Sequence, residues 1–264
     1  MDNTRTPYVI CQDIISHEKI SWAIDSFSPF KSPGPDGIMP IMLQKAKEHI
    51  IPWLHRMFAL CLSLNHVPSN WRKVKVIFIP KAGRRSHEDA KDFRPISLTS
   101  FQLKTLERLI DAHLRQRLEG TGKLSDSQHA YLRGRSTDTA LHEVDSYIRF
   151  RKQRYVQTSG AGYTTGGVIS PLLWIMAVNS ILVELDSRGV RVVAYADDMV
   201  ILVSGLFPDV ISDIMSDALP LVSHWATSCG LGLSPQKTEL VLFTTRTKVP
   251  GFRLPQLDPN FHGD

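Results

Sequence analysis

The chain has 264 residues, with 31 Lys and Arg against 26 Asp and Glu, so its net charge is +5. This length allows one large domain or two small ones. An apolar fraction of 42% suffices for a sizeable core and excludes a disordered chain, while 16 Gly and 16 Pro exclude collagen-like and linker sequences. The mild basic excess permits a polyanionic partner without requiring one.

The cysteines and the apolar segments exclude further classes. Cys11, Cys61 and Cys229 lie far apart and form no C-x-x-C pair, which excludes a zinc knuckle and argues against a disulfide scaffold. The first ten residues lack the apolar stretch of a secretory signal. Polar residues interrupt the most apolar run, 168–185, so we expect no membrane span and no membrane partner. We expect a soluble protein inside the cell, in the cytoplasm or the nucleus.

Hydrophobic periodicity and turn signals predict a chain of mixed helices and strands. In chain order, the expected elements are a helix at 17–27, a rigid loop at 31–38, a helix at 39–62, strands at 74–80 and 93–98, helices at 101–118 and 138–152, a polar break at 155–165, a helix from Ser170, two strands within 190–205, a helix at 209–228 with a kink at Pro220, and a strand at 239–244. The loop 31–38 holds two Pro and two Gly in eight residues, which prevents helix and strand alike. Pro171 takes a favoured position in the first turn of the helix that Ser170 would cap.

Charge is concentrated between Trp71 and Arg94, where eight basic residues face three acidic ones. The basic residues are Arg72, Lys73, Lys75, Lys81, Arg84, Arg85, Lys91 and Arg94. A solvated hairpin is the plainer interpretation of such a run. A segment that binds phosphate groups is the functional one.

Asp197 and Asp198 lie between two apolar strand segments within 190–205. Asp is a poor strand former, and its burial costs free energy unless it is paired or bound to a metal. Two adjacent carboxylates held by buried strands suit a hard cation such as Mg²⁺, and two-metal phosphoryl transfer needs such ligands. A plain hairpin with acidic turn residues is an equally open alternative on the local pattern alone.

Upstream, Gly166 and Gly167 precede the helix at Ser170, where paired glycines let a ligand approach the backbone or simply form a turn.

Seven segments of the chain, in the order in which they occur, resemble the reverse transcriptases of LINE-like, non-long-terminal-repeat retrotransposons, especially those of insects. They are KSPGPDGI (31–38), WRKVKVIFIPKAG (71–83), DFRPISLTS (92–100), SDSQHAYLRGRSTDTALHEV (125–144), GGVISPLLW (166–174), YADD (195–198) and GLGLSPQKTELVLF (230–243). Any one segment can arise by chance, whereas seven in family order are specific.

The resemblance implies an α+β fold with the fingers and palm of a right-hand polymerase and an antiparallel palm hairpin. It implies RNA-directed DNA polymerase activity by two-metal nucleotidyl transfer, with Mg²⁺ as the cofactor and Mn²⁺ as a substitute. Tyr195 would begin the polymerase motif, Asp197 would bind the catalytic metals and Asp198 would support them. The implied partners are an RNA template, a DNA primer and deoxynucleotide triphosphates.

The resemblance also implies roles outside the hairpin. Residues implied to position the template and the incoming nucleotide are Gly166, Gly167, Ser170 and Pro171. Lys237 would donate a proton to the pyrophosphate leaving group. Lys81 and Arg94 would approach the triphosphate or the template. For these three basic residues, ordinary surface charge is an equally open alternative.

One part of the family pattern is absent. The resemblance implies a first catalytic aspartate on an apolar palm strand between the 138–152 helix and Gly166, yet the segment between them has no Asp and no apolar strand. Asp138 is better explained as an acid at a helix start, and Asp145 lies in a helical pattern. Thr165 stands where relatives usually carry Gln, which weakens the template-positioning assignment.

The sequence therefore predicts an incomplete palm and a polymerase activity that is lost or very weak, as in an internally deleted copy or a wrongly joined gene. The expected regions are an N-terminal extension (1–30), a fingers-like region (31–154), a partial palm (155–248) and a loose tail (249–264). A non-catalytic RNA- or DNA-binding remnant is one alternative. An unstable pseudogene product is another, because a hairpin without a third strand is marginal in water.

Overall fold

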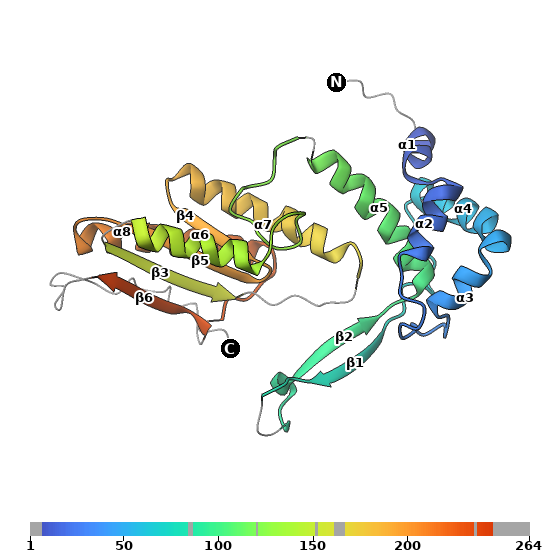
Figure 1. The fold of residues 1–264 in the computed structure, drawn as a ribbon, viewed down its shortest axis with the longest axis horizontal. Helices are drawn as coiled ribbons and strands as arrows, with labels where there is room; N and C mark the ends of the chain where they lie inside the picture. The colour runs from blue at the N-terminus through green and yellow to red at the C-terminus, as the bar shows by residue number, and fades with distance from the viewer. Residues whose placement is uncertain are drawn as a thin grey trace. The chain divides into compact units, whose positions relative to one another are not determined.

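The computed structural model describes residues 7–83, 87–119, 121–150, 153–160, 167–234 and 237–244 (Figure 1). The chain divides into two compact units. The first unit comprises residues 1–121 and 164–172, and the second comprises residues 122–163 and 173–264. The assignment of fingers and palm regions along the chain stays a prediction.

Helices build most of the first unit. They are α1 (Pro7–Ile14), α2 (His17–Asp25), α3 (Pro40–Lys45), α4 (Lys47–Ser63) and α5 (Phe101–Glu119). Helix α2 begins where the Ser16 hydroxyl accepts the Lys19 N–H at 3.2 Å, an N-cap that satisfies an otherwise free donor. The side chains of Ile20, Ile24 and Phe58 are fully buried in the core of this unit.

The single helix expected at 39–62 is two helices, because the chain turns at Ala46 between α3 and α4. Apolar spacing carries on across the break, so the periodicity alone did not reveal it. A two-stranded antiparallel hairpin completes the unit and is formed by β1 (Lys75–Pro80) and β2 (Phe93–Leu98). The 3-10 turn η1 (Ala90–Asp92) lies directly before β2. Both strands confirm the sequence prediction, and every residue of β1 is exposed.

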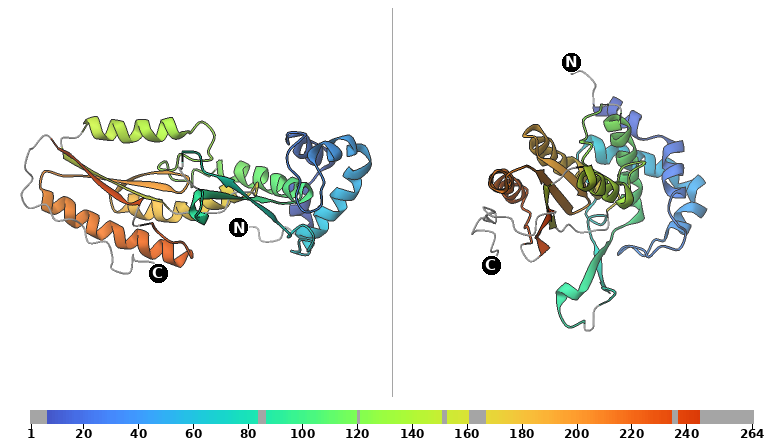
Figure 2. Two further views of the ribbon diagram at one scale, coloured as in Figure 1. Left: turned by 90° about the horizontal axis from the view of Figure 1, so that it is seen from below. Right: turned by 60° about the vertical axis from the view of Figure 1, so that its left-hand side comes forward.

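The second unit is a sheet between helices. Four antiparallel strands lie in the order β4 (Arg191–Tyr195), β5 (Asp198–Ser204), β3 (Gln153–Gly160) and β6 (Glu239–Thr244). Helices α7 (Ser170–Ser187) and α8 (Pro208–Ser228) pack against one face and α6 (Thr137–Phe150) against the other, as the left view of Figure 2 shows. Alternate residues of β4 serve the two faces: Val192 packs toward α7 and α8, and Val193 packs toward α6.

Strand β3 corrects the sequence prediction. The segment 155–165 was expected to be a polar break with no strand, yet residues 153–160 form a central strand that pairs with β5 and with β6. Pairing on both edges satisfies the backbone polar groups of the strand, and this tertiary context outweighs weak local propensity. The expectation that the 190–205 hairpin lacks a pairing neighbour is therefore wrong.

The remaining elements agree with the sequence in kind. The helices near 17–27, 101–118, 138–152 and 209–228 and the strands near 190–205 and 239–244 are present, with ends shifted by a few residues. The mixture of helices and antiparallel sheets confirms the mixed class expected. No helix within the described ranges combines the length and the apolar character that a membrane crossing requires.

Candidate active site

Asp197 and Asp198 lie where β4 turns into β5. Tyr195 is opposite Asp198 in the register, so Ala196 and Asp197 are the two central residues of the turn and Asp198 already belongs to β5. Ala196 has φ +53°, as the first central residue of the tight hairpin turns requires. This conformation is unfavourable for a residue other than Gly. Such a conformation persists where surrounding contacts hold it, and a contact from outside the hairpin reaches this turn.

Trp174 of α7 supplies that contact. Its indole Nε1 donates a hydrogen bond of 2.6 Å to the Ala196 carbonyl oxygen, and the side chain is only 8% exposed. No pattern in the sequence indicated the link between Trp174 and the turn, although a buried indole N–H needs an acceptor.

Two negative charges lie next to each other at the turn, and one of them is partly buried. Partial burial raises the pKa of Asp198, the neighbouring Asp197 carboxylate raises it further, and the Lys237 ammonium opposes both. Lys237 lies just before β6 and is exposed. The structure thus brings Lys237 into electrostatic reach of Asp198, and its role in proton donation stays a prediction. A divalent cation would relieve the repulsion between the two carboxylates.

The pair fits one cation better than two. Mg²⁺ is commonly held through one or two carboxylates, with the other positions filled by water or phosphate oxygens. A pair of ions needs more acidic ligands than Asp197 and Asp198 provide. Within the ranges that the structure describes, no cluster of three or more His, Cys, Asp or Glu residues is placed to hold a metal.

Strand β3, which pairs with β5, places no third carboxylate beside Asp197 and Asp198. Gly160 of β3 lies directly opposite Asp198 of β5, and directly opposed residues share a face with Cβ atoms about 5 Å apart. Position 160 is thus where a carboxylate on β3 would adjoin Asp198. The sequence has no Asp or Glu between Asp145 and Glu184. On α6, Asp145 forms an ion pair of 2.6 Å with Arg149.

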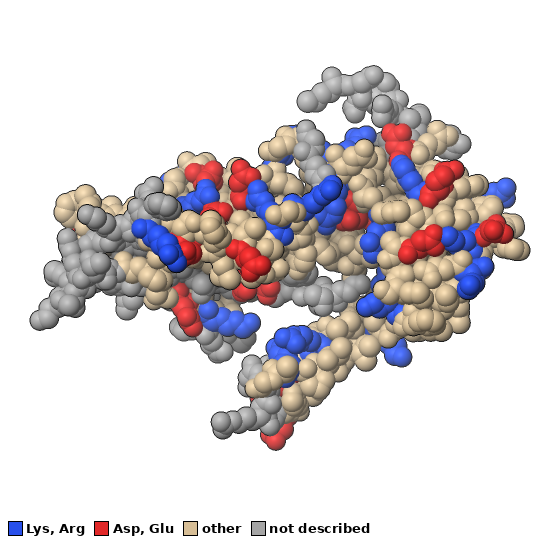
Figure 3. Space-filling view, viewed as in Figure 1, with Lys and Arg blue, Asp and Glu red and all other residues tan. Residues whose placement is uncertain are grey.

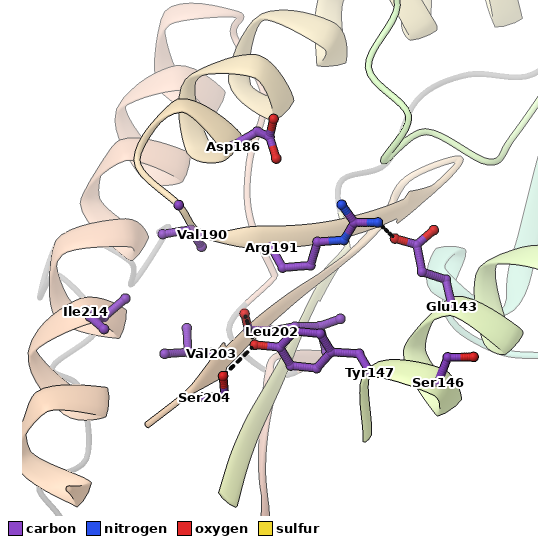
Figure 4. A pocket seen from close by; sticks show the side chains of 11 residues that line it. Glu143, Ser146, Tyr147, Asp186, Val190, Arg191, Leu202, Val203, Ser204 and Ile214 are labelled. Carbon is purple, nitrogen blue, oxygen red and sulfur yellow. Dashed lines mark hydrogen bonds and ion pairs between the residues drawn. The ribbon is translucent and has the colours of Figure 1, made fainter. Parts of the chain in front are cut away.

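Two larger cavities lie beside the hairpin. One of about 330 Å³ lies on the α6 side beside Asp198 and Tyr195, with Leu141 and Val144 in its wall. The other, of about 580 Å³, opens at the far ends of β4 and β5. Its lining is shown in Figure 4 and includes an ion pair between Arg191 and Glu143 and a 3.1 Å hydrogen bond from Tyr147 Oη to Ser204 Oγ. Of these two, only the first adjoins Asp198, and a smaller cavity of about 20 Å³ on the Trp174 side is lined by both Asp197 and Asp198.

The segment 125–136, within one of the seven segments that carry the resemblance, supports the outer edge of β4. The Ala194 N–H donates to the Ser127 carbonyl and the His129 N–H donates to the Ala194 carbonyl, both at 2.8 Å. The buried His129 ring contacts Thr139 Oγ1 and Glu143 Oε2, each at 2.9 Å. The segment 125–136 thus holds β4 and α6 together just before the turn.

The paired glycines belong to the first unit, and Gly166 lies outside the described residues. At Gly167 an added Cβ would stand 2.5 Å from Ser170 Oγ, so that hydroxyl would have to move. Ser170 begins α7, with Pro171 following it. Glu107 of α5, which the sequence did not single out, accepts the Val168 N–H at 2.8 Å. Burial raises the pKa of Glu107, and the backbone N–H groups of Val168 and Ile169 act in the opposite direction.

Lys81 and Arg94 are near the tip of the β1–β2 hairpin. Arg94 is opposite Ile79, and the Lys81 N–H donates to the Asp92 carbonyl at 2.8 Å, which extends the ladder by one pair. Because side chains alternate along a strand, positions 79, 81 and 94 share one face. The structure therefore places these two predicted phosphate-contacting residues on the same face of an exposed hairpin.

Comparison with known proteins identifies related sequences. Residues 138–254 match the family model described as reverse transcriptase (RNA-dependent DNA polymerase). A Pol polyprotein from the R1 element of Bradysia coprophila is 24% identical over 265 residues, which cover 80% of this chain and 26% of that protein. A probable RNA-directed DNA polymerase from transposon BS of Drosophila melanogaster is 23% identical over 314 residues, covering 95% of this chain and 34% of that protein. A Pol polyprotein from the R2 element of Popillia japonica is 31% identical over 141 residues, covering 53% of this chain and 18% of that protein.

Two features of these matches bear on the chain. It spans about a quarter to a third of the length of the first two relatives. The alignment with the transposon BS protein runs over 314 residues although the chain has 264, so at least 50 residues of that relative have no counterpart here. The chain is related to the reverse transcriptases of LINE-like, non-long-terminal-repeat retrotransposons.

Proposed function

We propose that the chain is the RNA-directed DNA polymerase domain of a LINE-like element, with nucleotidyl transfer lost or very weak because the first catalytic aspartate is absent. The first unit would correspond to the fingers, and the sheet of the second unit would correspond to an incomplete palm. The observation that carries this proposal is the pairing of Asp198 with Gly160. Strand β3 stands beside the acidic turn, and no carboxylate is present along it.

The missing carboxylate affects both binding and rate. With Asp197 and Asp198 alone the site would hold one Mg²⁺ or Mn²⁺ loosely. Two-metal catalysis uses paired ions to stabilise the attacking and leaving oxygens together. Removal of a primary ligand disturbs geometry and electrostatics at once, so we expect polymerase activity to be lost or very weak.

The alignment lengths support an internal deletion. The residues of the transposon BS protein without a counterpart here are enough for a strand and its flanking helices, since a strand has about 5–6 residues and a helix about 11. The place we infer for the deletion is the short connection between α6 and α7, where the family's first catalytic aspartate is expected. Sequencing the transcript across codons 155–162 distinguishes a deletion in the element from a wrongly joined gene.

The remaining site residues are assigned by analogy with the family. Tyr195 would contact the template or the nucleotide beside the carboxylates. Gly167 and Ser170, with Gly166 before them, would position the template and the incoming nucleotide. Lys237 would act as a proton donor to the leaving pyrophosphate. The partners proposed are an RNA template, a DNA primer and deoxynucleotide triphosphates.

Nucleic-acid binding without catalysis is the alternative that a specific observation favours. Lys and Arg side chains are exposed on the β1–β2 hairpin, which Figure 3 shows projecting from the helices of its unit. Basic residues on an exposed ribbon bind phosphates through counterion release, and this does not depend on an intact metal site. An unstable pseudogene product is a further alternative, and the extensive cores of both units argue against it.

Primer extension on an RNA template tests the proposal. The purified chain is assayed with Mg²⁺ and with Mn²⁺ beside Asp197→Ala, and RNA binding is measured across a salt series. We expect RNA binding that weakens with salt, and no extension above that of Asp197→Ala. Extension that disappears in Asp197→Ala would refute the loss of activity. A chain that shows no cooperative thermal transition would instead favour the unstable pseudogene product.

A further inference from the structure

Helix α4 carries apolar side chains on both sides. Its inner side chains Leu54, Phe58 and Cys61 are buried in the core of the first unit, where α4 contacts α1, α2 and α3. Its outer side exposes Trp53 by 66%, Met57 by 40% and Leu60 by 57%, and the C-cap residue Leu64 that follows is exposed by 69%. We call these four residues the α4 stripe. Exposed apolar residues are unremarkable singly, but a continuous row marks a contact surface.

The spacing of the α4 stripe is that of a helix-pairing seam. Its members follow one another at intervals of four, three and four residues, which is the pattern that lets side chains of one helix insert between those of another. Arg56, beside the stripe, places its guanidinium 5.7 Å from the centre of the Trp53 ring. This contact leaves the Trp53 ring two-thirds exposed.

We propose that the α4 stripe is the interface of a homodimer, in which α4 packs antiparallel to α4 of a second copy. A two-fold axis between positions 57 and 60 sets Met57 against Leu60 of the other copy and Trp53 against Leu64. An apolar cavity of about 200 Å³ lies at the C-terminal end of α4 and is lined by Met57, Leu60, Cys61, Leu64, His66 and Pro68. The Trp53 ring of the second copy enters this cavity, so the surface is complementary to itself.

Area and charge are consistent with a second copy as the occupant. The α4 stripe exposes roughly 450 Å² of apolar surface per copy, so pairing buries at most about 900 Å², which is in the range of weak, transient interfaces. The four residues of the α4 stripe carry no charge, so an antiparallel pair brings no like charges together along it. We therefore expect a reversible dimer that depends on concentration.

The mass in solution tests the dimer. Light scattering or sedimentation equilibrium is run on the full chain from about 1 to 100 µM. We expect the mass to rise from 29.7 kDa toward twice that value. Trp53→Glu and Leu64→Lys are each expected to abolish the rise. Leu141→Glu, which changes a leucine of similar exposure on α6 (61% against 57% for Leu60), is expected to leave it unchanged.

A mixture of two variants tests the register. When Trp53→Glu and Leu64→Lys are combined, a mixed dimer pairs the new carboxylate with the new ammonium at one end and retains the native Trp53–Leu64 contact at the other. Dimer formation in the mixture, and not in either variant alone, supports the antiparallel pair. A chain that stays monomeric at the highest concentration, or a dimer that survives both substitutions, overturns the proposal. Circular dichroism of each variant verifies that its helices are retained.

Discussion

The hydrogen bond from Trp174 to the turn gives a prediction with a matched control. In Trp174→Phe the Ala196 carbonyl loses its 2.6 Å donor, which costs about 1–3 kcal/mol for a partly buried acceptor left unpaired. The smaller ring also leaves a void at a site that is only 8% exposed, for about 1 kcal/mol more. We expect a total loss of about 2–4 kcal/mol in the free energy of unfolding.

Trp225→Phe is the control because it removes the same atoms from the same unit. The Trp225 Nε1 donates to Ser180 Oγ at 3.1 Å in an exposed contact, where water replaces the lost partner. A cost of about 1 kcal/mol is expected there. Urea unfolding followed by circular dichroism compares the two variants. Equal losses in both, or a loss below about 0.5 kcal/mol in Trp174→Phe, would refute the idea that Trp174 holds the turn.

Two further predictions concern the first unit. Burial raises the pKa of Glu107 above its ordinary value of 4.5, so its stabilising contribution is present below pH 4.5 and is lost as pH rises through the folded-state pKa. Urea unfolding as a function of pH should therefore show wild type losing stability relative to Glu107→Gln between pH 4.5 and neutrality, and a constant difference would contradict this. In Gly34→Ala the new Cβ would stand 2.7 Å from the Ser100 backbone nitrogen, at a cost of about 1–3 kcal/mol. Thermal unfolding should rank it below Gly37→Ala, which has open space around its Cβ but a φ of +70°, and the reverse order would refute the close approach.

The sequence predicted those parts of the fold that depend on local pattern. Apolar periodicity located α5, α6 and α8, and β-branched runs located β1, β4 and β5. It failed at β3, because that strand owes its stability to neighbours on both edges rather than to its own side-chain types. The break between α3 and α4 was also missed, since apolar spacing continues across Ala46.

For the candidate site, the sequence identified the charged residues but not the residues that hold them in place. It singled out Asp197, Asp198 and Lys237, and the structure brings their charges within reach of one another. It did not identify Trp174 as the anchor of the turn or Glu107 as the acceptor before α7. Such contacts join residues more than twenty positions apart, and no spacing rule in a single sequence encodes them.

Cation binding tests the central claim most directly, because that claim concerns a carboxylate that is missing opposite Asp198. Mn²⁺ binding is measured by electron paramagnetic resonance for wild type, Gly160→Asp and Gly160→Asn, the last being equal in size to the Asp variant but uncharged. We predict one weakly bound ion in wild type, and binding at least about tenfold tighter in Gly160→Asp alone, since a third carboxylate then adjoins the pair. Two ions bound by wild type, or no difference between the Asp and Asn variants, would contradict the account.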